Sequence, residues 1–439
     1  MRASRVLVLG FAALISLGTG LLSLPAATTN RERLPLVDAL FTATSAVCVT
    51  GLTVVDTGVA FSPLGQAMIL GLIQVGGVGF VVMAITVSVL IGRRVGLRER
   101  LLVREALGQI RLQGMVRLVL YVIAVALILE SAGATLLFLR WLPEMGIAQA
   151  AWFAVFHAIS AFTNAGFDLF SQMGSSSLSI YRNDLVIVGV VGGLIALGSL
   201  GVTVLDELWR WPRTRRLSLH SRLVLLVSVS LWIGGALLIF VDETLSGTLV
   251  GQLPLGQRLL TAAFHSISAR TGGFSTVPLA EFSQASLIGL LTLMFIGAST
   301  ASMGGGVKTN TIGALLMTVW SIARGRLEVE AFGRTIPQET IYKALAVVTG
   351  AMLWVLGAST ILAILEDHAL MPLLLETVSA FGTVGYSIGI TSELSVAGKL
   401  VIIATMFAGR LGPLTLVAAL TRQPQLPAVR YPEEKILIG

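Results

Sequence analysis

The sequence has few charged side chains, a single cysteine and little histidine. Of its 439 residues, 12% are charged and 55% are hydrophobic, whereas an ordinary soluble domain has about 25% charged residues. This deficit excludes a soluble enzyme. Cys48 is the only cysteine, so no disulfide can form within the chain. His157 and His265 have no cysteine or carboxylate at ligand spacing, which argues for a hydrogen-bonded scaffold role over metal binding.

Nucleotide-binding patterns are missing as well. The chain contains no P-loop and no Rossmann glycine pattern. We therefore expect no enzyme activity and no cofactor in this chain, and any dependence on ATP or ADP has to come from a separate subunit. The net charge of +7 would suit a nucleic-acid partner. In a membrane protein, however, the location of charges matters more than their sum, and no nucleic acid is expected.

Long apolar runs are abundant. The mean hydropathy is +0.88, and runs of about 20 residues, each long enough to cross a hydrocarbon layer of about 30 Å, recur along the whole chain. The first run leads past Pro25 into more membrane-like sequence, so we expect a retained span and not a cleaved signal peptide. The sequence predicts a polytopic helical membrane protein.

Basic residues cluster at five places beside the apolar blocks. The positive-inside rule assigns such clusters to the cytoplasm. We therefore expect a cell-membrane protein with both termini cytoplasmic. The segment 93–117 either anchors this topology or contacts anionic lipid headgroups or an acidic partner surface. The clusters are Arg2 and Arg5; Arg93, Arg94, Arg98, Arg100, Arg104, Arg111 and Arg117; Arg210, Arg213, Arg215, Arg216 and Arg222; Arg324, Arg326, Arg334 and Lys343; and Arg422, Arg430 and Lys435.

The chain repeats one unit four times. Each unit holds an apolar span, a short amphipathic stretch that ends in a polar turn with a central glycine, and a second apolar span. The fold class is therefore all-α, with eight full spans plus four re-entrant pore helices around a pseudo-fourfold pore. The repeats are 1–110, 111–216, 217–335 and 336–439, and their spans pair 4–24 with 64–92, 115–140 with 184–209, 221–241 with 285–321, and 343–365 with 396–420.

The four turns share their sequence. They read SAVCVTGL at 45–52, SAFTNAGF at 160–167, SARTGGF at 268–274 and SAFGTVGY at 379–386, with central glycines about 110 residues apart. A turn at membrane depth is tolerated only where it is buried in protein or lines water. Glycine allows backbone angles that point successive carbonyls to one side, and a ring of carbonyls can replace the hydration shell of a monovalent cation. The short helix before each turn directs its negative end to the same place.

The turns therefore predict an ion-selectivity filter, and TVGY spells four of the five letters of the potassium-channel filter TVGYG. Ordinary extramembrane turns are the alternative. The filter segments are 49–52, 164–167, 271–274 and 383–386. The expected K+ ligands are backbone carbonyls of Val49, Thr50, Gly51, Asn164, Ala165, Gly166, Thr271, Gly272, Gly273, Thr383, Val384 and Gly385.

With these motifs, the chain resembles the Trk/Ktr/HKT superfamily of potassium transporters over nearly its whole length. It begins directly at the first repeat, without two extra leading spans, and so looks most like the Ktr-type membrane subunit. The resemblance implies a homodimer whose protomers each hold a pore, bound to a cytoplasmic nucleotide-binding regulatory ring. Each turn has one filter glycine where the channels have two. We therefore expect fewer carbonyl sites and weaker selection of potassium over sodium.

The second span of the third repeat is unusually long and has a small, polar middle at 298–311. Glycine costs about 1 kcal/mol against alanine in a helix, and Lys at the bilayer centre costs at least about 2.5 kcal/mol. A broken backbone is therefore expected there. The resemblance implies an intramembrane loop that obstructs the pore; a packed kink is the alternative. The gate residues are Gly304, Gly305, Gly306 and Lys308, with Arg410 from the last span.

Other intramembrane ionisable residues have open roles. Arg410 is either an electrostatic gate element or a clamp on the broken helix. We expect the Arg270 side chain to run outward and pin the third turn. Glu130, Glu366 and Asp367 are placed at or near span ends, where snorkelling is favoured over a proton relay.

The most economical function is a potassium pore that conducts inward. A potential of 100 mV supplies about 2.3 kcal/mol per charge, so uptake needs no ATP hydrolysis in this chain. A secondary transporter with alternating access would also use broken helices, but the four repeats share one orientation, which argues against inverted halves. A membrane scaffold or receptor would leave the four turns without a purpose.

Overall fold

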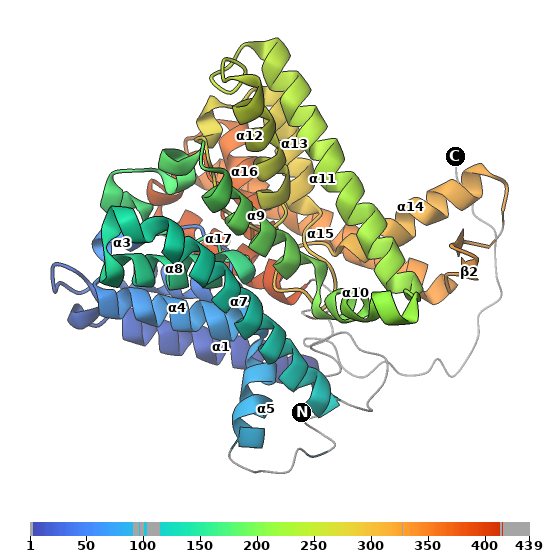
Figure 1. Ribbon diagram of the computed structural model, residues 1–439, viewed down its shortest axis with the longest axis horizontal. Coiled ribbons are helices and arrows are strands. Elements are labelled where there is room, and N and C mark those ends of the chain that lie inside the picture. Colours follow the sequence, from blue (N-terminus) through green and yellow to red (C-terminus); the bar gives the residue numbers. More distant parts are fainter. Residues whose placement is uncertain are drawn as a thin grey trace.

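The computed structural model describes residues 3–90, 96, 101–102, 115–326, 328–412 and 415. Four long helices open the four units: α1 (Ala3–Leu22), α7 (Met115–Met145), α11 (Leu219–Ser246) and α15 (Gln338–Leu365). Each is long and apolar enough to cross a membrane. In Figure 1, α7 and α11 cross the front of the view, with α9, α16 and α17 between them. The prediction of a mostly helical protein with several apolar spans is confirmed.

A short helix follows each long one: α2 (Leu36–Cys48), α8 (Ile147–Phe162), α12 (Leu255–Ser268) and α16 (Leu370–Gly382). Each short helix packs against the long helix that precedes it. These helices coincide with the predicted pore helices, and each ends at one of the glycine-centred turns.

Three of the second spans are interrupted in the described residues, unlike the first spans, and the fourth is described as one helix. They consist of α4 (Pro63–Val78) and α5 (Phe80–Leu90), α9 (Leu185–Leu200) and α10 (Val202–Thr214), α13 (Gln284–Phe295) and α14 (Thr309–Ala323), and α17 (Val396–Leu411). α9 and α10 are bent by 100° relative to each other, so the span predicted for 184–209 is not one continuous helix. The cause is Gly201, whose φ of +86° is left-handed; Gly79 (+95°) and Gly412 (+81°) end α4 and α17 in the same way.

The second-span helices begin with the same kind of N-cap. Ser62, Ser283 and Ser395 each accept a hydrogen bond from the backbone N–H three residues later, and Asp184 accepts from the N–H groups of residues 186 and 187. Such caps satisfy free N–H groups in the first turn. They fix where the chain re-enters the helical layer after each turn.

The four units close into a ring. α8 packs against α4, α12 against α9, α16 against α13, and α2 against α17. Each short helix therefore contacts the second span of the preceding unit, and the first unit is joined to the fourth. This arrangement directs the C-terminal ends of all four short helices toward one centre.

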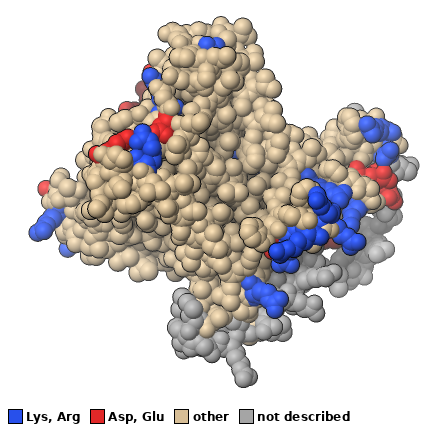
Figure 2. Space-filling model, in the orientation of Figure 1, with Lys and Arg blue, Asp and Glu red and all other residues tan. Residues whose placement is uncertain are grey.

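The remaining elements are small. They are η1 (Pro25–Ala27), α3 (Thr57–Ala60), η2 (Phe170–Met173), η3 (Ser177–Tyr181), η4 (Leu279–Glu281), η5 (Ile390–Ser392) and a hairpin of β1 (Glu330–Ala331) and β2 (Arg334–Thr335). Figure 2 shows Lys and Arg gathered over α10 and the start of α11, and again at the end of α14, beside large uncharged areas.

Several predicted features fall outside the described residues. They are the basic residues Arg2, Arg93, Arg94, Arg98, Arg100, Arg104, Arg111, Arg422, Arg430 and Lys435, and the ends of the predicted spans 64–92 and 396–420.

Candidate functional site

The four turns share an unusual backbone. Each has a left-handed φ at its central glycine: +87° at Gly51, +70° at Gly166, +76° at Gly273 and +94° at Gly385. Each also has a left-handed residue two positions earlier: Val49, Asn164, Thr271 and Thr383, with φ between +52° and +79°. A left-handed backbone is costly for β-branched residues. The earlier position is left-handed in all four units. It is strained where it holds Val49, Thr271 or Thr383, whereas asparagine, present as Asn164, tolerates this conformation.

The four turns lie against one another. A side chain added at Gly51 would come within 2.5 Å of the Ala165 carbonyl oxygen, and one at Gly385 within 2.5 Å of the Thr50 oxygen. At Gly273 it would come within 2.5 Å of the Val384 oxygen and 2.7 Å of Gly166 Cα. The first turn therefore contacts the second and fourth, and the third contacts the second and fourth. Only glycine fits at this centre, where backbone carbonyls are the nearest polar groups.

The serine at the start of each turn sequence explains part of this geometry. Ser45 Oγ accepts from Gly51 N at 3.1 Å, and Ser379 Oγ accepts from Gly385 N at 3.1 Å. Ser160 and Ser268 donate instead to the carbonyls of Phe167 and Phe274, both at 2.6 Å. All four serines are buried. Each one bonds the end of its short helix to the chain just after the turn.

The position three residues before that serine is polar in every unit, and it holds Thr42, His157, His265 and Glu376. His157 Nε2 accepts from Leu169 N at 3.2 Å, and His265 Nε2 accepts from Thr276 N at 3.3 Å. Thr391 Oγ1 donates to Glu376 at 2.6 Å. His157, His265 and Glu376 hold the segment after the turn, so the two histidines have the scaffold contacts that the sequence indicated.

A cavity of about 440 Å³ lies directly beside the central glycines. All four glycines line it, together with Asp56 and Asp168 and several serine and threonine hydroxyls. Asp56 accepts from the N–H groups of Gly58 and Val59 and from the Ser171 hydroxyl. Two carboxylates and many hydroxyl oxygens make this vestibule attractive to a cation.

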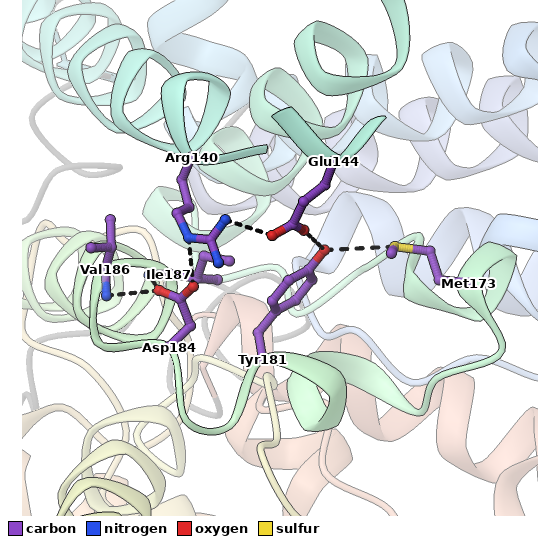
Figure 3. Close-up of polar contacts among 7 residues, drawn as sticks. All are labelled: Arg140, Glu144, Met173, Tyr181, Asp184, Val186 and Ile187. Carbon is purple, nitrogen blue, oxygen red and sulfur yellow. Dashed lines mark hydrogen bonds and ion pairs between the residues drawn. The ribbon is translucent and has the colours of Figure 1, made fainter. Parts of the chain in front are cut away.

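An ion-pair cluster lies between α7 and the chain from η3 to α9 (Figure 3). Arg140 donates through Nε to Asp184 at 2.7 Å and through a second nitrogen to Glu144 at 2.5 Å. Tyr181 donates to Glu144 at 2.9 Å, and Asp184 caps α9. The cluster joins α7 to η3 and to the start of α9. The chain at the start of η3 contributes Ser175 and Ser177 to the lining of the vestibule.

The irregular segment 296–308 between α13 and α14 (the intramembrane segment below) packs against the turns. Gly305 N donates to Thr383 Oγ1 at 2.9 Å, and a side chain at Gly304 would come within 2.3 Å of Thr271 Oγ1. Lys308 Nζ donates to the Gly304 carbonyl at 2.7 Å. Two of the three predicted gate glycines therefore contact threonines of the third and fourth turns.

Two arginines hold the intramembrane segment. Arg410 donates to the Met303 carbonyl in the segment and to the carbonyls of Gly76 and Gly77 in α4. Arg270, fully buried, donates to the Gly297 carbonyl at 3.1 Å and to Thr309 Oγ1 at 2.7 Å. Arg270 thus bonds to both ends of the segment. Arg410 joins its middle to the first unit.

A second, smaller cavity of about 170 Å³ is lined by Gly306, Lys308, Gly409 and Arg410. It has two side-chain cations where the vestibule has two carboxylates. A cation that entered it would meet like charge.

Glycines that the sequence analysis did not single out make the close packing possible. A side chain at Gly76, Gly198 or Gly409 would lie within 2.0 Å, 1.9 Å and 1.9 Å of the carbonyl oxygens of Val47, Phe162 and Phe381. Each comes three residues before the glycine that ends its helix. The signal was therefore a repeated G-x-x-G, at 76–79, 198–201 and 409–412.

Glu130 differs from its prediction. It does not snorkel: its residue is 5% exposed in the interior of α7, and both its carboxylate oxygens accept from Gln74 Nε2, at 3.0 and 3.2 Å. The membrane interface is out of its reach because α4 covers it. Glu366 does lie at a span end, where it accepts from Ser395 N and Oγ at 3.0 and 2.6 Å.

Comparison with known proteins agrees with this architecture. The family model TrkH, described as a cation transport protein, matches residues 11–430. The chain is 39% identical to the Ktr system potassium uptake protein B of Vibrio alginolyticus, over 99% of this chain and 94% of that one. It is 38% identical to the protein of the same name from Bacillus subtilis, over 99% and 96%.

Two further comparisons extend the family. The potassium/sodium uptake protein NtpJ of Enterococcus hirae is 36% identical, over 99% of this chain and 97% of that one. The solved potassium transporter TrkH of Vibrio parahaemolyticus has the same fold, with a TM-score of 0.73 at 19% identity, covering 95% of this chain and 84% of that one. The chain is a multi-pass membrane protein that belongs to the TrkH family of cation transport proteins and is similar to its Ktr-type members.

Proposed function

We propose that this chain is the potassium-translocating pore subunit of a K+ uptake system. The observation that supports this most is the convergence of four glycine turns with one shared backbone, in which no side chain fits. Oxygen atoms of the backbone are then the available ligands, and a ring of carbonyls replaces the hydration shell of K+. The relatives named as potassium uptake proteins support the same ion.

Within this proposal the four turns form the selectivity filter. Its ligands are the backbone carbonyls of the twelve residues predicted above, three from each unit. The vestibule with Asp56 and Asp168 collects cations at the outer side. K+ moves inward down its electrochemical gradient, toward the side on which basic residues cluster. Because each turn has one filter glycine, selection against Na+ is weak and Na+ also passes, at a lower rate than K+. A relative named as a potassium/sodium uptake protein supports this.

Gating is assigned to the intramembrane segment. Gly304, Gly305 and Gly306 lie against the turns, and Lys308 and Arg410 place positive charge beside them. The segment has to move for ions to pass. A cytoplasmic nucleotide-binding ring moves it, the chain works as a homodimer in the cell membrane, and both termini are cytoplasmic. The naming of the relatives as parts of a Ktr system supports a partner subunit.

The test is cation flux from purified protein in liposomes, with K+ compared against Na+. We expect K+ flux to exceed Na+ flux, and Gly273→Ser to reduce K+ flux by at least about tenfold, because its side chain would meet the Val384 oxygen. Gly247→Ser is the matched control, since Gly247 is also left-handed (φ +65°) with nothing within 4 Å.

Parental K+ flux in a correctly assembled Gly273→Ser protein would overturn the filter assignment. A flux that saturates with K+ and requires a counter-transported solute would favour a secondary transporter instead.

A further inference from the structure

Helix α10 (Val202–Thr214) departs from the direction of α9, and its second half is exposed. It turns by 100° from α9 at Gly201. Its first half packs through Val204, Leu205 and Leu208, but all residues from 209 to 216 are exposed. Trp209 is 78% exposed and Trp211 is 42% exposed. A helix turned across the direction of the spans, with exposed tryptophan, suits the plane of a membrane interface.

The exposed part of α10 is also basic. Arg210 pairs with Asp206 at 2.9 Å, and Arg215 lies over the Trp211 ring at 5.0 Å. In the part of the chain that the structure describes, no carboxylate lies within salt-bridge distance of Arg213, Arg215 or Arg216. Figure 2 shows the resulting positive surface over α10 and the start of α11. Unpaired arginines beside exposed tryptophans complement the anionic headgroups of a lipid surface.

The basic surface is held in a fixed place. Glu207 accepts a hydrogen bond from Ser218 N at 2.8 Å, at the start of α11. This contact closes the loop 215–218 against α10. The three arginines are therefore presented from a rigid corner and not from a free tail.

The other end of α10 is joined to the intramembrane segment. Val202 N, in its first turn, donates to the Ala301 carbonyl at 3.1 Å. On the α9 side of the bend, Ser299 N donates to the Ser199 carbonyl at 3.0 Å, and Met303 N donates to the Gly198 carbonyl at 3.2 Å. A displacement of α10 therefore acts directly on the backbone of residues 299–303.

We propose that α10 is a binding surface for anionic lipid headgroups and that lipid bound there shifts the intramembrane segment away from the turns. The proposal rests on the proposed function, since the segment has to control cation flux. A ligand shifts such an equilibrium only through different affinities for the two positions. The two positions of the intramembrane segment differ in their affinity for lipid because α10 is hydrogen-bonded to the segment beside the bend at Gly201. Any movement of α10 relative to the membrane plane therefore also moves the segment.

The first experiment measures K+ flux from the purified chain in vesicles of phosphatidylcholine, with and without phosphatidylglycerol. We expect the anionic lipid to raise flux roughly threefold or more. The triple variant Arg213→Gln, Arg215→Gln, Arg216→Gln should lose this response. The matched control Arg31→Gln, Arg33→Gln, Arg182→Gln removes three charges outside α10 and should keep it.

Lipid-independent K+ flux in the parent overturns this inference alone, whereas absence of K+ flux in every vesicle overturns the proposed function. The lipid proposal is also overturned if the triple variant keeps the lipid response and loses only the binding of a regulatory subunit. That result would show that α10 binds a protein partner.

A second experiment does not depend on flux. Brominated phosphatidylglycerol should quench the tryptophan fluorescence of the parent more than brominated phosphatidylcholine does. The difference should shrink in Trp209→Phe, Trp211→Phe and in the triple arginine variant. Equal quenching by both lipids in the parent would contradict a preference for anionic headgroups.

Discussion

The two cavities beside the glycine turns differ in the sign of their charge. Asp56 and Asp168 line the larger one, and Lys308 and Arg410 line the smaller one. A cation is attracted to the first and repelled from the second. Within the proposed function, the larger cavity concentrates ions and the smaller one controls their passage.

The two ends also differ in how they are held. Around the vestibule the chain is fixed by hydrogen bonds of serine, histidine and backbone groups and of the Asp56 carboxylate, with no side-chain cation among these contacts. At the other end, Lys308 and Arg410 donate to the carbonyls of Gly304 and Met303. Carbonyl oxygens are also the groups that a permeating cation binds. In the proposed gating, the side-chain cations compete with a permeating cation for these oxygens until the segment moves.

The largest effect is expected at the glycines that let the short helices approach the second spans. Gly198→Ala would place Cβ 1.9 Å from the Phe162 carbonyl oxygen, a backbone atom that cannot rotate away. We expect a loss of about 3 kcal/mol in stability, together with loss of flux, because the end of α8 that precedes the second turn has to shift. Thermal unfolding of the purified protein measures the first effect.

Gly189→Ala and Gly193→Ala are the controls for that change. Both glycines lie in the same helix, α9, and an added Cβ would meet nothing within 4 Å. Alanine has the higher helix propensity, so these variants should be as stable as the parent or slightly more so. Equal damage at residues 189 and 198 would show that helix α9 tolerates no substitution, and the close approach would not be the cause.

The second effect concerns the controlling end. Deleting Gly304 to Gly306 removes the part of the segment that touches Thr271 and Thr383. We expect basal K+ flux to rise on the order of tenfold, since the obstructed population is lost. The ratio of K+ to Na+ flux should stay at the parental value, because the filter turns are unchanged. Unchanged or lower flux in a correctly assembled protein would refute the gate role.

The sequence predicted the repeated elements better than their interruptions. The four turns are marked by a serine six or five residues before a glycine. This pattern is local, so it can be recognised in the sequence without knowing what the turn packs against. The bend at Gly201 was missed because the span was assigned from its hydropathy, whereas the left-handed φ of Gly201 accompanies a close approach to the distant carbonyl oxygens of Thr300 and Ala301. Glu130 was wrongly predicted to snorkel because its partner, Gln74, lies on another helix, and such a contact cannot be recognised in the sequence.

The third prediction separates charge from clamping at Arg410. Arg410→Gln keeps a donor for the carbonyls of Met303 and Gly76 but removes the charge, whereas Arg410→Lys keeps the charge and loses the forked geometry. We expect the glutamine variant to raise K+ flux several-fold and the lysine variant to raise it less. Equal increases in both variants would show that the side chain acts as a clamp alone. The measurement is flux in liposomes at equal protein content.

The smallest effect is expected at the attracting end. Asp56→Asn removes one vestibule carboxylate but keeps an oxygen that can accept from Gly58 N, Val59 N and the Ser171 hydroxyl. At low ionic strength we expect K+ flux at limiting K+ to fall about twofold, because less cation is concentrated at the entrance. Salt screens such an effect over about 8 Å at 0.15 M, so the difference should fade as inert salt is added. Glu32→Gln, at an exposed position that does not line the vestibule, is the control and should leave flux unchanged. If the K+ flux of Asp56→Asn stayed below that of the parent at high salt, the carboxylate would act by holding the vestibule loop. The charge of the larger cavity would then not explain how it differs from the smaller one.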